Sequence, residues 1–324
     1  MTNFRRDTLI ICSLAVLAVL VGTFSGSASM QHFLTQLLVL GMFASAFDFA
    51  FGRSGLFSAG HAAFFGCGAY ATALSTLRYD WTFMPSLALA ALVGGAIAFV
   101  FAVLARRVPG VYFALATLAM AQLVLVITEV KLSPWSGGSD GLAGVPRPIL
   151  FGVDLGGTGQ YLLFVCVVFV IALVTLSLLR HSPYGQVLRA IRENAVRAEQ
   201  LGYNIDLYRI SAFTVSGAYS GVAGGLFGGL IFYVGPDLLR MTLSVDVLVM
   251  SVLGGPNTLL GPLLGVAVFE TSREVITRYT DHWHGFVGIM FILATLFLPF
   301  GLVGLFRARR RPKAEATAEA RDFS

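Results

Sequence analysis

Eight apolar runs, most of them close to twenty residues long, dominate this chain of 324 residues. A helix needs about 20 apolar residues to cross the hydrocarbon core of a bilayer. Helices are favoured there because every backbone polar group in lipid needs an internal partner. Charged residues make up 12% of the chain, about half the proportion of a typical soluble domain. The sequence therefore predicts an all-α, polytopic transmembrane helical bundle, with spans at 9–24, 33–51, 56–77, 84–105, 111–130, 161–179, 210–234 and 286–306.

The segment 244–279 is apolar but interrupted. Gly254-Gly255-Pro256-Asn257 separates two stretches that are each short for a complete crossing. We expect a broken or re-entrant pair of helices here, which returns the chain to the side from which it started. With the eight longer runs, this pair gives about ten spans in all.

The basic residues are divided unequally between the two sides of the predicted membrane. If the N-terminus is cytoplasmic, sixteen of the 22 basic residues fall on cytoplasmic segments, as expected from the excess of Lys and Arg in cytoplasmic loops. We therefore predict that both termini are cytoplasmic. Residues 1–306 form the predicted transmembrane domain, and the basic tail 307–324 is expected to be disordered. The first apolar run is interpreted as a retained helix, although a cleavable signal peptide has a similar pattern.

Ionisable residues at membrane depth are costly and are candidates for function. Asp48 and His61 lie in predicted spans, and Asp246 lies in the first half of the broken pair. Polar side chains also lie in or near the glycine-rich segments 52–60 and 253–265. The predicted translocation pathway therefore contains Asp48, Ser58, His61, Thr117, Asp246 and Thr258. Hydrogen bonding between helices is the alternative role for such residues.

The longest predicted cytoplasmic connection, 180–209, has the pattern of an amphipathic helix. Ser182-Pro183 is a turn signal and Gly202 a helix stop. Between them, the apolar residues Leu188, Ile191, Ala195, Ala198 and Leu201 share one helical face. A solvated surface helix has the same pattern, but this position is also where a cytoplasmic motor could bind. The residues predicted to take part in such coupling are Arg189, Arg192, Glu193, Ala198 and Gly202.

Several classes of function are disfavoured by what the sequence lacks. The only lysines are Lys131 and Lys313, and neither lies in a phosphate-binding GxxxxGK[ST] loop. We therefore expect no cofactor, no metal and no ATP hydrolysis by this chain, and we do not expect an enzyme. The basic residues lie between apolar runs instead of forming one stripe, which indicates contact with membrane lipid and no nucleic acid. A secondary transporter or channel for a small polar solute remains an alternative to an ATP-driven permease.

Five motifs occur in an order that is specific in combination. They lie at 58–66 (SAGHAAFFG), 110–119 (GVYFALATLA), 137–142 (GGSDGL), 182–194 (SPYGQVLRAIREN) and 253–262 (LGGPNTLLGP). In these motifs the chain resembles the branched-chain amino acid ABC-transporter permeases of the LivM type, over about 34–302. The chain departs from the family pattern at Ala59 and Ser136. In the general coupling pattern Glu-Ala-Ala-x-x-x-Gly, only Ala198 and Gly202 match.

The resemblance implies a permease subunit of an ABC importer in the bacterial inner membrane. It further implies a second, LivH-type permease subunit, two ABC ATPase subunits that bind the ATP, and an extracytoplasmic solute-binding protein. The implied cargo is branched-chain amino acids or similar small solutes. Because relatives in the family carry urea, amides or small acids, the resemblance does not decide which solute this chain carries. Pairing of the chain with a second copy of itself also stays open.

Overall fold

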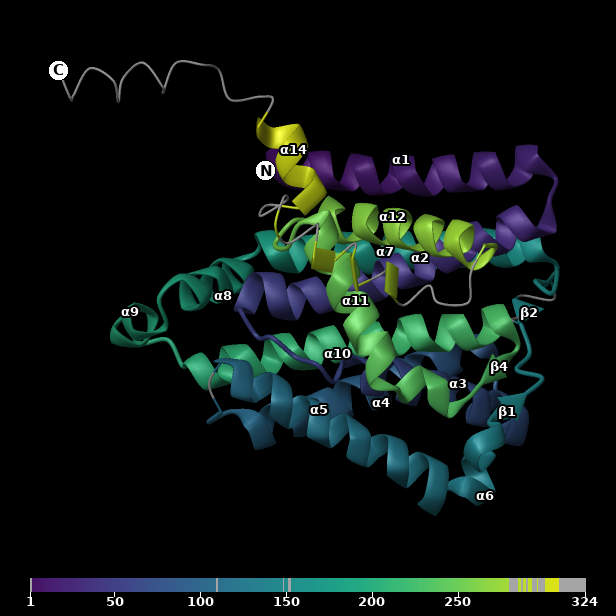
Figure 1. Ribbon diagram of the computed structural model, residues 1–324, viewed down its shortest axis with the longest axis horizontal. Helices are drawn as coiled ribbons and strands as arrows, with labels where there is room; N and C mark the ends of the chain where they lie inside the picture. The colour runs from purple at the N-terminus through teal and green to yellow at the C-terminus, as the bar shows by residue number, and fades with distance from the viewer. Residues whose placement is uncertain are drawn as a thin grey trace.

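Long helices lie side by side and form most of the computed structural model (Figure 1). The structure describes residues 2–108, 110–147, 149–150, 153–279, 285–286, 288–289, 291–292, 296 and 301–308. Within these residues, six helical segments are long and apolar enough to cross a membrane. They are Asp7–Ser25, Ala28–Arg53, Phe83–Ala105, Gly110–Lys131, Thr158–His181 and Ile205–Ile231.

These segments correspond to six of the eight predicted spans. They contain the helices α1 (Thr2–Ser25), α2 (Ala28–Asp48), α4 (Phe83–Ala105), α5 (Gly110–Val126), α7 (Thr158–His181) and α10 (Ile205–Ile231). Two of them end in a π-helical turn, η1 (Phe49–Arg53) after α2 and η2 (Ile127–Lys131) after α5. The predicted all-α bundle is therefore observed, whereas the total of ten spans stays a prediction.

The two remaining predicted spans differ from a simple crossing. The run 56–77 is not helical from its start, because α3 (His61–Tyr79) begins only at His61, after the non-helical residues 55–60. The helix therefore starts five residues later than the predicted span, within the motif at 58–66. The run 286–306 is described only in part, and its described residues include the start of α14 (Gly301–Ala308).

Close packing of small residues joins α10 to α3 and α4. A Cβ atom added to Gly68 of α3 would overlap the backbone of Gly221 of α10. A Cβ on Gly94 of α4 would lie 2.5 Å from the carbonyl oxygen of Gly217, one turn earlier on α10. Small residues allow transmembrane helices to approach until their backbones touch. The three helices therefore form one closely packed block.

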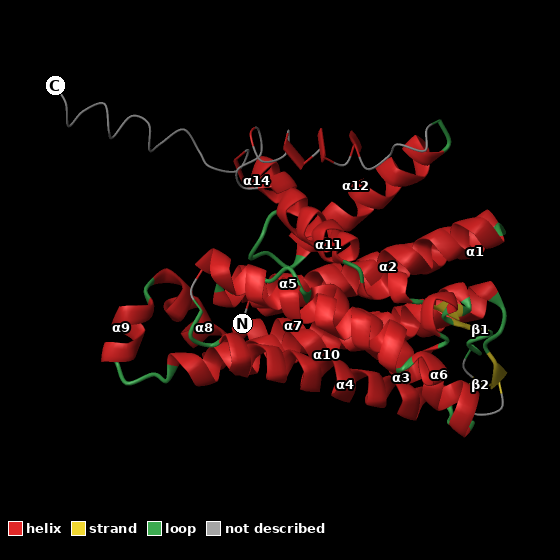
Figure 2. Cartoon of the chain, turned by 60° about the horizontal axis from the view of Figure 1, so that its bottom comes forward, coloured by secondary structure: helices red, strands yellow, loops and turns green. Residues whose placement is uncertain are grey.

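The predicted break in 244–279 is present. The chain forms α11 (Met241–Gly254) and α12 (Leu260–Thr277), which pack against each other and against α2, and α12 rises at an angle to α2 in Figure 2. Gly255, between them, has a φ of 112°, which a residue with a side chain rarely adopts. Added Cβ atoms on Gly254 and Gly265 would overlap the backbone of the opposite helix, so the pair can fold back only with glycine at these positions.

The predicted single amphipathic helix in 180–209 is wrong. The structure has two helices, α8 (Pro183–Glu193) and α9 (Ala195–Gln200), because Asn194 leaves the helical region with φ −157° and ψ 98°. The Asn194 side chain then accepts a hydrogen bond from the Arg197 amide and caps α9. Leu201, predicted to share the apolar face of a single helix with Leu188 and Ile191, is 72% exposed.

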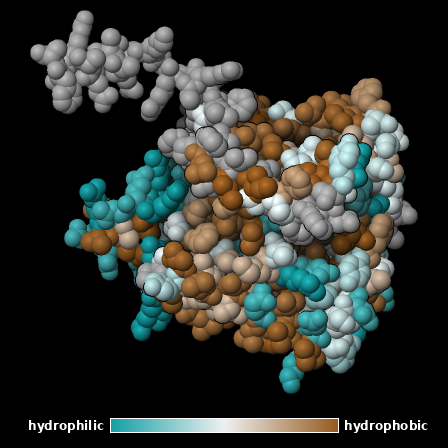
Figure 3. Space-filling view, in the orientation of Figure 1, coloured by the Kyte–Doolittle hydropathy of each residue, from teal (hydrophilic) through white to brown (hydrophobic). Residues whose placement is uncertain are grey.

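Short elements close the opposite end of the bundle. They are α6 (Ser133–Ser136), the 3₁₀ turns η3 (Gly138–Asp140) and η4 (Pro236–Leu239), and four strands of two residues each. β1 (Leu142–Ala143) pairs antiparallel with β4 (Tyr233–Val234), and β2 (Ile149–Leu150) pairs antiparallel with β3 (Val153–Asp154). In Figure 3 hydrophilic residues gather over α8 and α9, whereas much of the neighbouring surface is hydrophobic.

Candidate functional site

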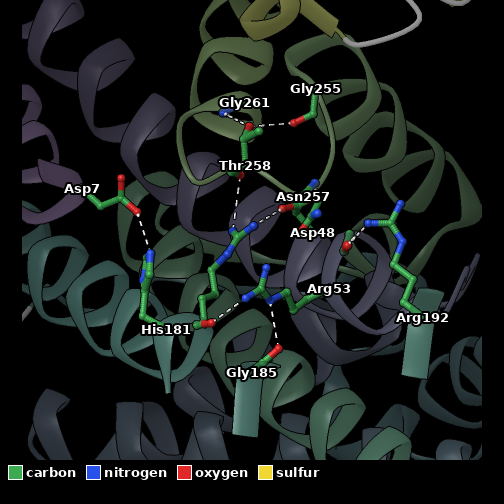
Figure 4. Close-up of polar contacts among 12 residues, drawn as sticks. Asp7, Asp48, Arg53, His181, Gly185, Arg192, Gly255, Asn257, Thr258 and Gly261 are labelled. Carbon is green, nitrogen blue, oxygen red and sulfur yellow. Dashed lines mark hydrogen bonds and ion pairs between the residues drawn. The ribbon is translucent and has the colours of Figure 1, made fainter. Parts of the chain in front are cut away.

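An ion pair is buried where α2, α7 and the α11–α12 break meet. Asp48 Oδ2 lies 3.2 Å from Arg180 Nη2, and the two side chains are 0% and 6% exposed. Asp48 Oδ1 accepts a second hydrogen bond, 2.7 Å long, from the backbone amide of Asn257. Arg180 also donates from Nη1 to the carbonyl oxygen of Thr258, at 3.3 Å. Each charge therefore has several partners, as a buried ion pair requires (Figure 4).

Two further arginines connect this ion pair to α8. Arg53, in the π-helical turn η1, donates from Nη2 to the Arg180 carbonyl at 2.8 Å and from Nε to the Gly185 carbonyl at 3.1 Å. Arg192, in the last turn of α8, donates to the carbonyl oxygen of Gly52. Since Arg53 and Gly52 follow Asp48 within one turn or two, the start and the end of α8 are both fixed to the chain next to the buried carboxylate. We call Asp48, Arg53, Arg180 and Arg192 with their partners the arginine network (Figure 4).

Thr258 closes the break between α11 and α12. Its hydroxyl donates to the Gly255 carbonyl at 2.8 Å and accepts from the Gly261 amide at 2.9 Å. This is the hydrogen bonding of a residue that caps a helix N-terminus. Thr258 was predicted in the pathway, and the structure places it half-buried with its hydroxyl occupied by these two backbone groups.

The start of α3 is held by polar side chains from two other helices and by Ser58, just before it in the chain. The Ala59 amide donates to Thr117 Oγ1 of α5 at 3.2 Å, and the Ala62 amide donates to Ser244 Oγ of α11 at 2.9 Å. Ser58 Oγ accepts from the Gly60 amide at 3.2 Å. These hydroxyls bind backbone amides that lack partners because the helix begins inside the bundle.

His61 is the third anchor of this helix start. Its Nε2 lies 2.9 Å from Ser216 Oγ of α10, and that hydroxyl donates to the Ala46 carbonyl at 2.6 Å. Ser216 therefore accepts from His61, which assigns the hydrogen to Nε2. Ser216 lies eleven residues after the start of α10, which is about 17 Å along the helix. The first turn of α3 thus lies well inside the bundle.

Phenylalanine rings surround His61 on its other sides. Its ring is 4.9 Å from Phe47, 5.2 Å from Phe64 and 5.3 Å from Phe213, all in edge-to-face geometry. His61 is 0% exposed, and its Nδ1 has no hydrogen-bond partner among the described residues. Together with Asp48, Ser58 and Thr117, four of the six predicted pathway residues are thus in the interior of this chain.

Asp246 is in a different environment from these four. It is half-buried on α11, and its charge is close enough to interact with that of Glu270 on α12. Glu270 Oε2 accepts from Gln36 Nε2 of α2 at 2.8 Å, and its Oε1 lies 3.5 Å from Arg273 Nη1. The broken pair and α2 therefore share a second polar cluster, separate from the arginine network.

The predicted coupling residues divide into an inner and an outer set. Ala198 is 2% exposed, and Gly202, with φ 88°, ends α9 in the left-handed conformation that suits glycine. Arg189 and Glu193 form an ion pair of 2.8 Å on the outside of α8, where they are 56% and 63% exposed. Gly202 and Arg192 are also exposed, but the Arg192 guanidinium is bound to the Gly52 carbonyl, so Arg189 and Glu193 are the charged pair of this set that is free to meet a partner protein.

Tyr184 attaches α8 to α10. Its hydroxyl is 2.8 Å from Ser211 Oγ, and its ring stacks on Tyr208 with centroids 5.6 Å apart. Burial raises the pKa of the Tyr184 phenol, so the hydroxyl stays protonated and able to donate across the neutral range.

Residues that the sequence did not single out complete both sites. Arg53 and Arg180 lie close to the quoted motifs, whereas Ser216 and Ser244 lie outside them. The partners of these four residues are 78 to 182 residues away in the chain. A buried acid such as Asp48 predicts that a basic partner exists. Only the fold identifies which basic residue is that partner.

Comparison with known proteins agrees with this architecture. Residues 29–295 match the family described as the branched-chain amino acid transport system permease component. The chain belongs to this family. It is 28% identical to the high-affinity branched-chain amino acid transport system permease protein LivM of Salmonella typhimurium strain LT2, over 95% of this chain and 78% of that protein. The LivM protein of Escherichia coli strain K12 is 26% identical over 95% of this chain and 77% of its own length.

A more distant relative extends the comparison to another cargo. The autoinducer 2 import system permease protein LsrC of Klebsiella pneumoniae is 29% identical over 60% of this chain and 56% of that protein. No solved structure matches the chain significantly. These relatives are transport permeases, and the chain is accordingly a multi-pass membrane permease subunit of an importer for small solutes.

Proposed function

We propose that this chain forms, with a second LivH-type permease subunit, the translocation pathway of an importer for branched-chain amino acids, driven by two separate ABC ATPase subunits. An extracytoplasmic solute-binding protein delivers the cargo, and both termini of the chain are cytoplasmic. The LivM names of the relatives support the cargo. Support for the topology comes from Asp7, whose carboxylate lies 3.7 Å from His181 Nε2, because α1 then begins at the same end of the bundle as α8.

The observation that carries the mechanism is the arginine network. It runs from α8, on the outside of one end, through Arg53 and Arg180 to Asp48 and then to the Asn257 amide at the α11–α12 break. In our proposal an ATPase subunit binds α8, and the network transmits the displacement of α8 to the broken helices. Strong, charge-assisted hydrogen bonds suit this role because they resist a change of distance.

The predicted pathway residues fit this proposal unequally. Asp48, Ser58, His61 and Thr117 hold helix ends in the interior, so we assign them a positioning role near the pathway. Asp246, half-buried beside Glu270, is the predicted residue best placed to face the solute. We propose that the surface of α11 and α12 next to α2 contributes the pathway on this subunit.

The test uses the exposed pair on α8. Exchanging its charges in the variant Arg189→Glu/Glu193→Arg keeps the ion pair within the helix but reverses the charges that a partner meets. We expect the reconstituted importer to lose at least tenfold in leucine uptake per ATP hydrolysed. The matched control is Arg278→Glu/Glu274→Arg, since Glu274 and Arg278 form a similarly exposed pair of 2.9 Å at the end of α12.

Two results would contradict the proposal. Normal coupling in the α8 variant, with an unaffected control, would remove α8 as the ATPase contact. Uptake of leucine by the purified chain alone, driven by an ion gradient, would replace the ABC mechanism with a secondary transporter.

A further inference from the structure

A small pocket lies between α4, α5, α10 and the segment before α3, apart from the sites described above. Its volume is about 120 Å³. Its wall is largely apolar and includes Leu56, Phe113 and Ile210. Three charged residues complete the lining, namely Arg106, Asp206 and Arg209. A charged rim over an apolar wall is the usual composition of a small-molecule site.

Arg209 is the half-buried member of these three charged residues, whereas Arg106 and Asp206 are exposed at the rim of the pocket. Arg209 Nε is shielded from solvent and has no hydrogen-bond partner among the residues that the structure describes. No ion pair joins Arg209 to Asp206, although these two described residues are three positions apart on α10 and therefore share a face. A buried guanidinium nitrogen without a partner is costly, which indicates that the pocket is built for an anionic group.

An anion alone does not account for Asp206. Its carboxylate would repel inorganic phosphate or a simple carboxylic acid, whereas it would attract an ammonium group. A ligand that carries both charges a few ångströms apart satisfies Arg209 and Asp206 together, with Arg106 as a second cation for its carboxylate. The α-amino acid backbone has this arrangement.

The apolar wall of the pocket favours an aliphatic side chain. The pocket of about 120 Å³ has room for several water-sized groups, since about 15 Å³ is the least that admits one. A charged side chain would leave a buried charge against Leu56 and Phe113.

We propose that this pocket binds a free α-amino acid with an aliphatic side chain, with its carboxylate on Arg209 and its ammonium group on Asp206. The inference rests on the proposed function, because it makes the ligand the same class of molecule as the cargo. Gly55 lines the pocket and also packs against the stem of Arg192 from α8. An amino acid in the pocket therefore supports the segment that α8 contacts, and we expect cargo at this end of the protein to slow the transport cycle.

The experiment locates the ligand directly. The complete importer, purified without its solute-binding protein, is irradiated with photo-leucine, and labelled peptides are identified by mass spectrometry. We expect saturable labelling on the peptides that contain Leu56, Phe113 or Ile210. Leucine should compete, whereas 4-methylpentanoic acid, which lacks the ammonium group, and 3-methylbutylamine, which lacks the carboxylate, should compete at least tenfold less well.

Variants separate the pocket from its surroundings. Arg209→Gln and Asp206→Asn should each reduce labelling at least tenfold. Arg107→Gln is the matched control, since Arg107 is an exposed neighbour of Arg106 that does not line the pocket. Circular dichroism and ATPase activity in detergent establish that each variant is folded and assembled.

The results distinguish this inference from the proposed function. Labelling that spreads over other helices, equal competition by 4-methylpentanoic acid, or full labelling of both pocket variants would overturn the amino-acid site. Uptake of leucine with the solute-binding protein present is measured separately. Normal uptake combined with no labelling of the pocket would refute the site and leave the proposed function intact, whereas pocket labelling without leucine uptake would refute the proposed cargo.

Discussion

Replacing Asp48 with asparagine removes one charge from the arginine network and changes little else. The side-chain amide of the variant keeps an oxygen that can accept from the Asn257 amide, so the loss is confined to the 3.2 Å contact with Arg180. At that distance, and at an effective dielectric constant of about 20, the attraction between two unit charges is about 5 kcal/mol. Removing one partner of a buried pair typically costs about 3–5 kcal/mol, because the other charge stays buried. The two estimates agree.

We expect Asp48→Asn to lower the thermal unfolding midpoint of the purified subunit, by on the order of 10 °C, and to impair uptake. The double variant Asp48→Asn/Arg180→Gln removes both charges and keeps neutral hydrogen bonding, so it should recover most of the lost stability. If the network transmits motion from α8, the double variant should still take up leucine poorly while it hydrolyses ATP. Thermal unfolding in detergent, with uptake and ATP hydrolysis in proteoliposomes, measures each quantity. A single variant as stable as the parent would refute the electrostatic reasoning, and a stable double variant with normal coupling would refute the transmission.

Three further predictions concern packing, the pathway and a helix cap. Gly94→Ala should lower the free energy of unfolding by about 1–3 kcal/mol, because the added Cβ forces α4 from α10. Gly95→Ala should leave it unchanged, since its Cβ would meet Ala218 Cβ at 3.4 Å, an ordinary contact distance. A larger fall in thermal stability for Gly95→Ala than for Gly94→Ala would contradict this. Asp246→Asn should reduce leucine uptake severalfold without changing the amount of assembled importer, and unchanged uptake would remove Asp246 from the pathway. Asn194→Ala should destabilise α9 by about 1 kcal/mol through loss of its cap, seen as faster hydrogen exchange of 195–200 with α8 unaffected.

The long helices could be predicted from the sequence because the requirement behind them is local. An apolar run of sufficient length crosses a membrane whatever its neighbours are, and six of the eight predicted runs contain such helices. The break at Gly254-Gly255 was equally predictable, since glycine and proline weaken a helix wherever they occur. The helix break at Asn194 was not predicted, because two local structures compete there. The chain can continue one helix through Asn194, or Asn194 can end that helix and cap a new one, and the sequence pattern alone does not decide between them.

The partners of the polar residues could not be predicted. Depth in the membrane identified Asp48 and His61 as exceptional, but a position along the chain does not say which way a side chain points. Asp48 turns to Arg180, which the sequence placed at the edge of a cytoplasmic connection, and His61 turns to Ser216. Such choices are fixed by how α2, α3, α7 and α10 are arranged around one another. The sequence therefore predicted which residues are unusual, and the fold shows what they contact.

The backbone contacts among α3, α4 and α10 limit how this subunit can change shape. Side chains that interdigitate can exchange one set of rotamers for another as two helices slide, but Gly68, Gly94, Gly217 and Gly221 have none to exchange. We expect these three helices to move as one rigid body during transport. Movement would then have to occur in the elements hinged around it, namely α8 and α9 at one end and the folded pair α11 and α12 along its side.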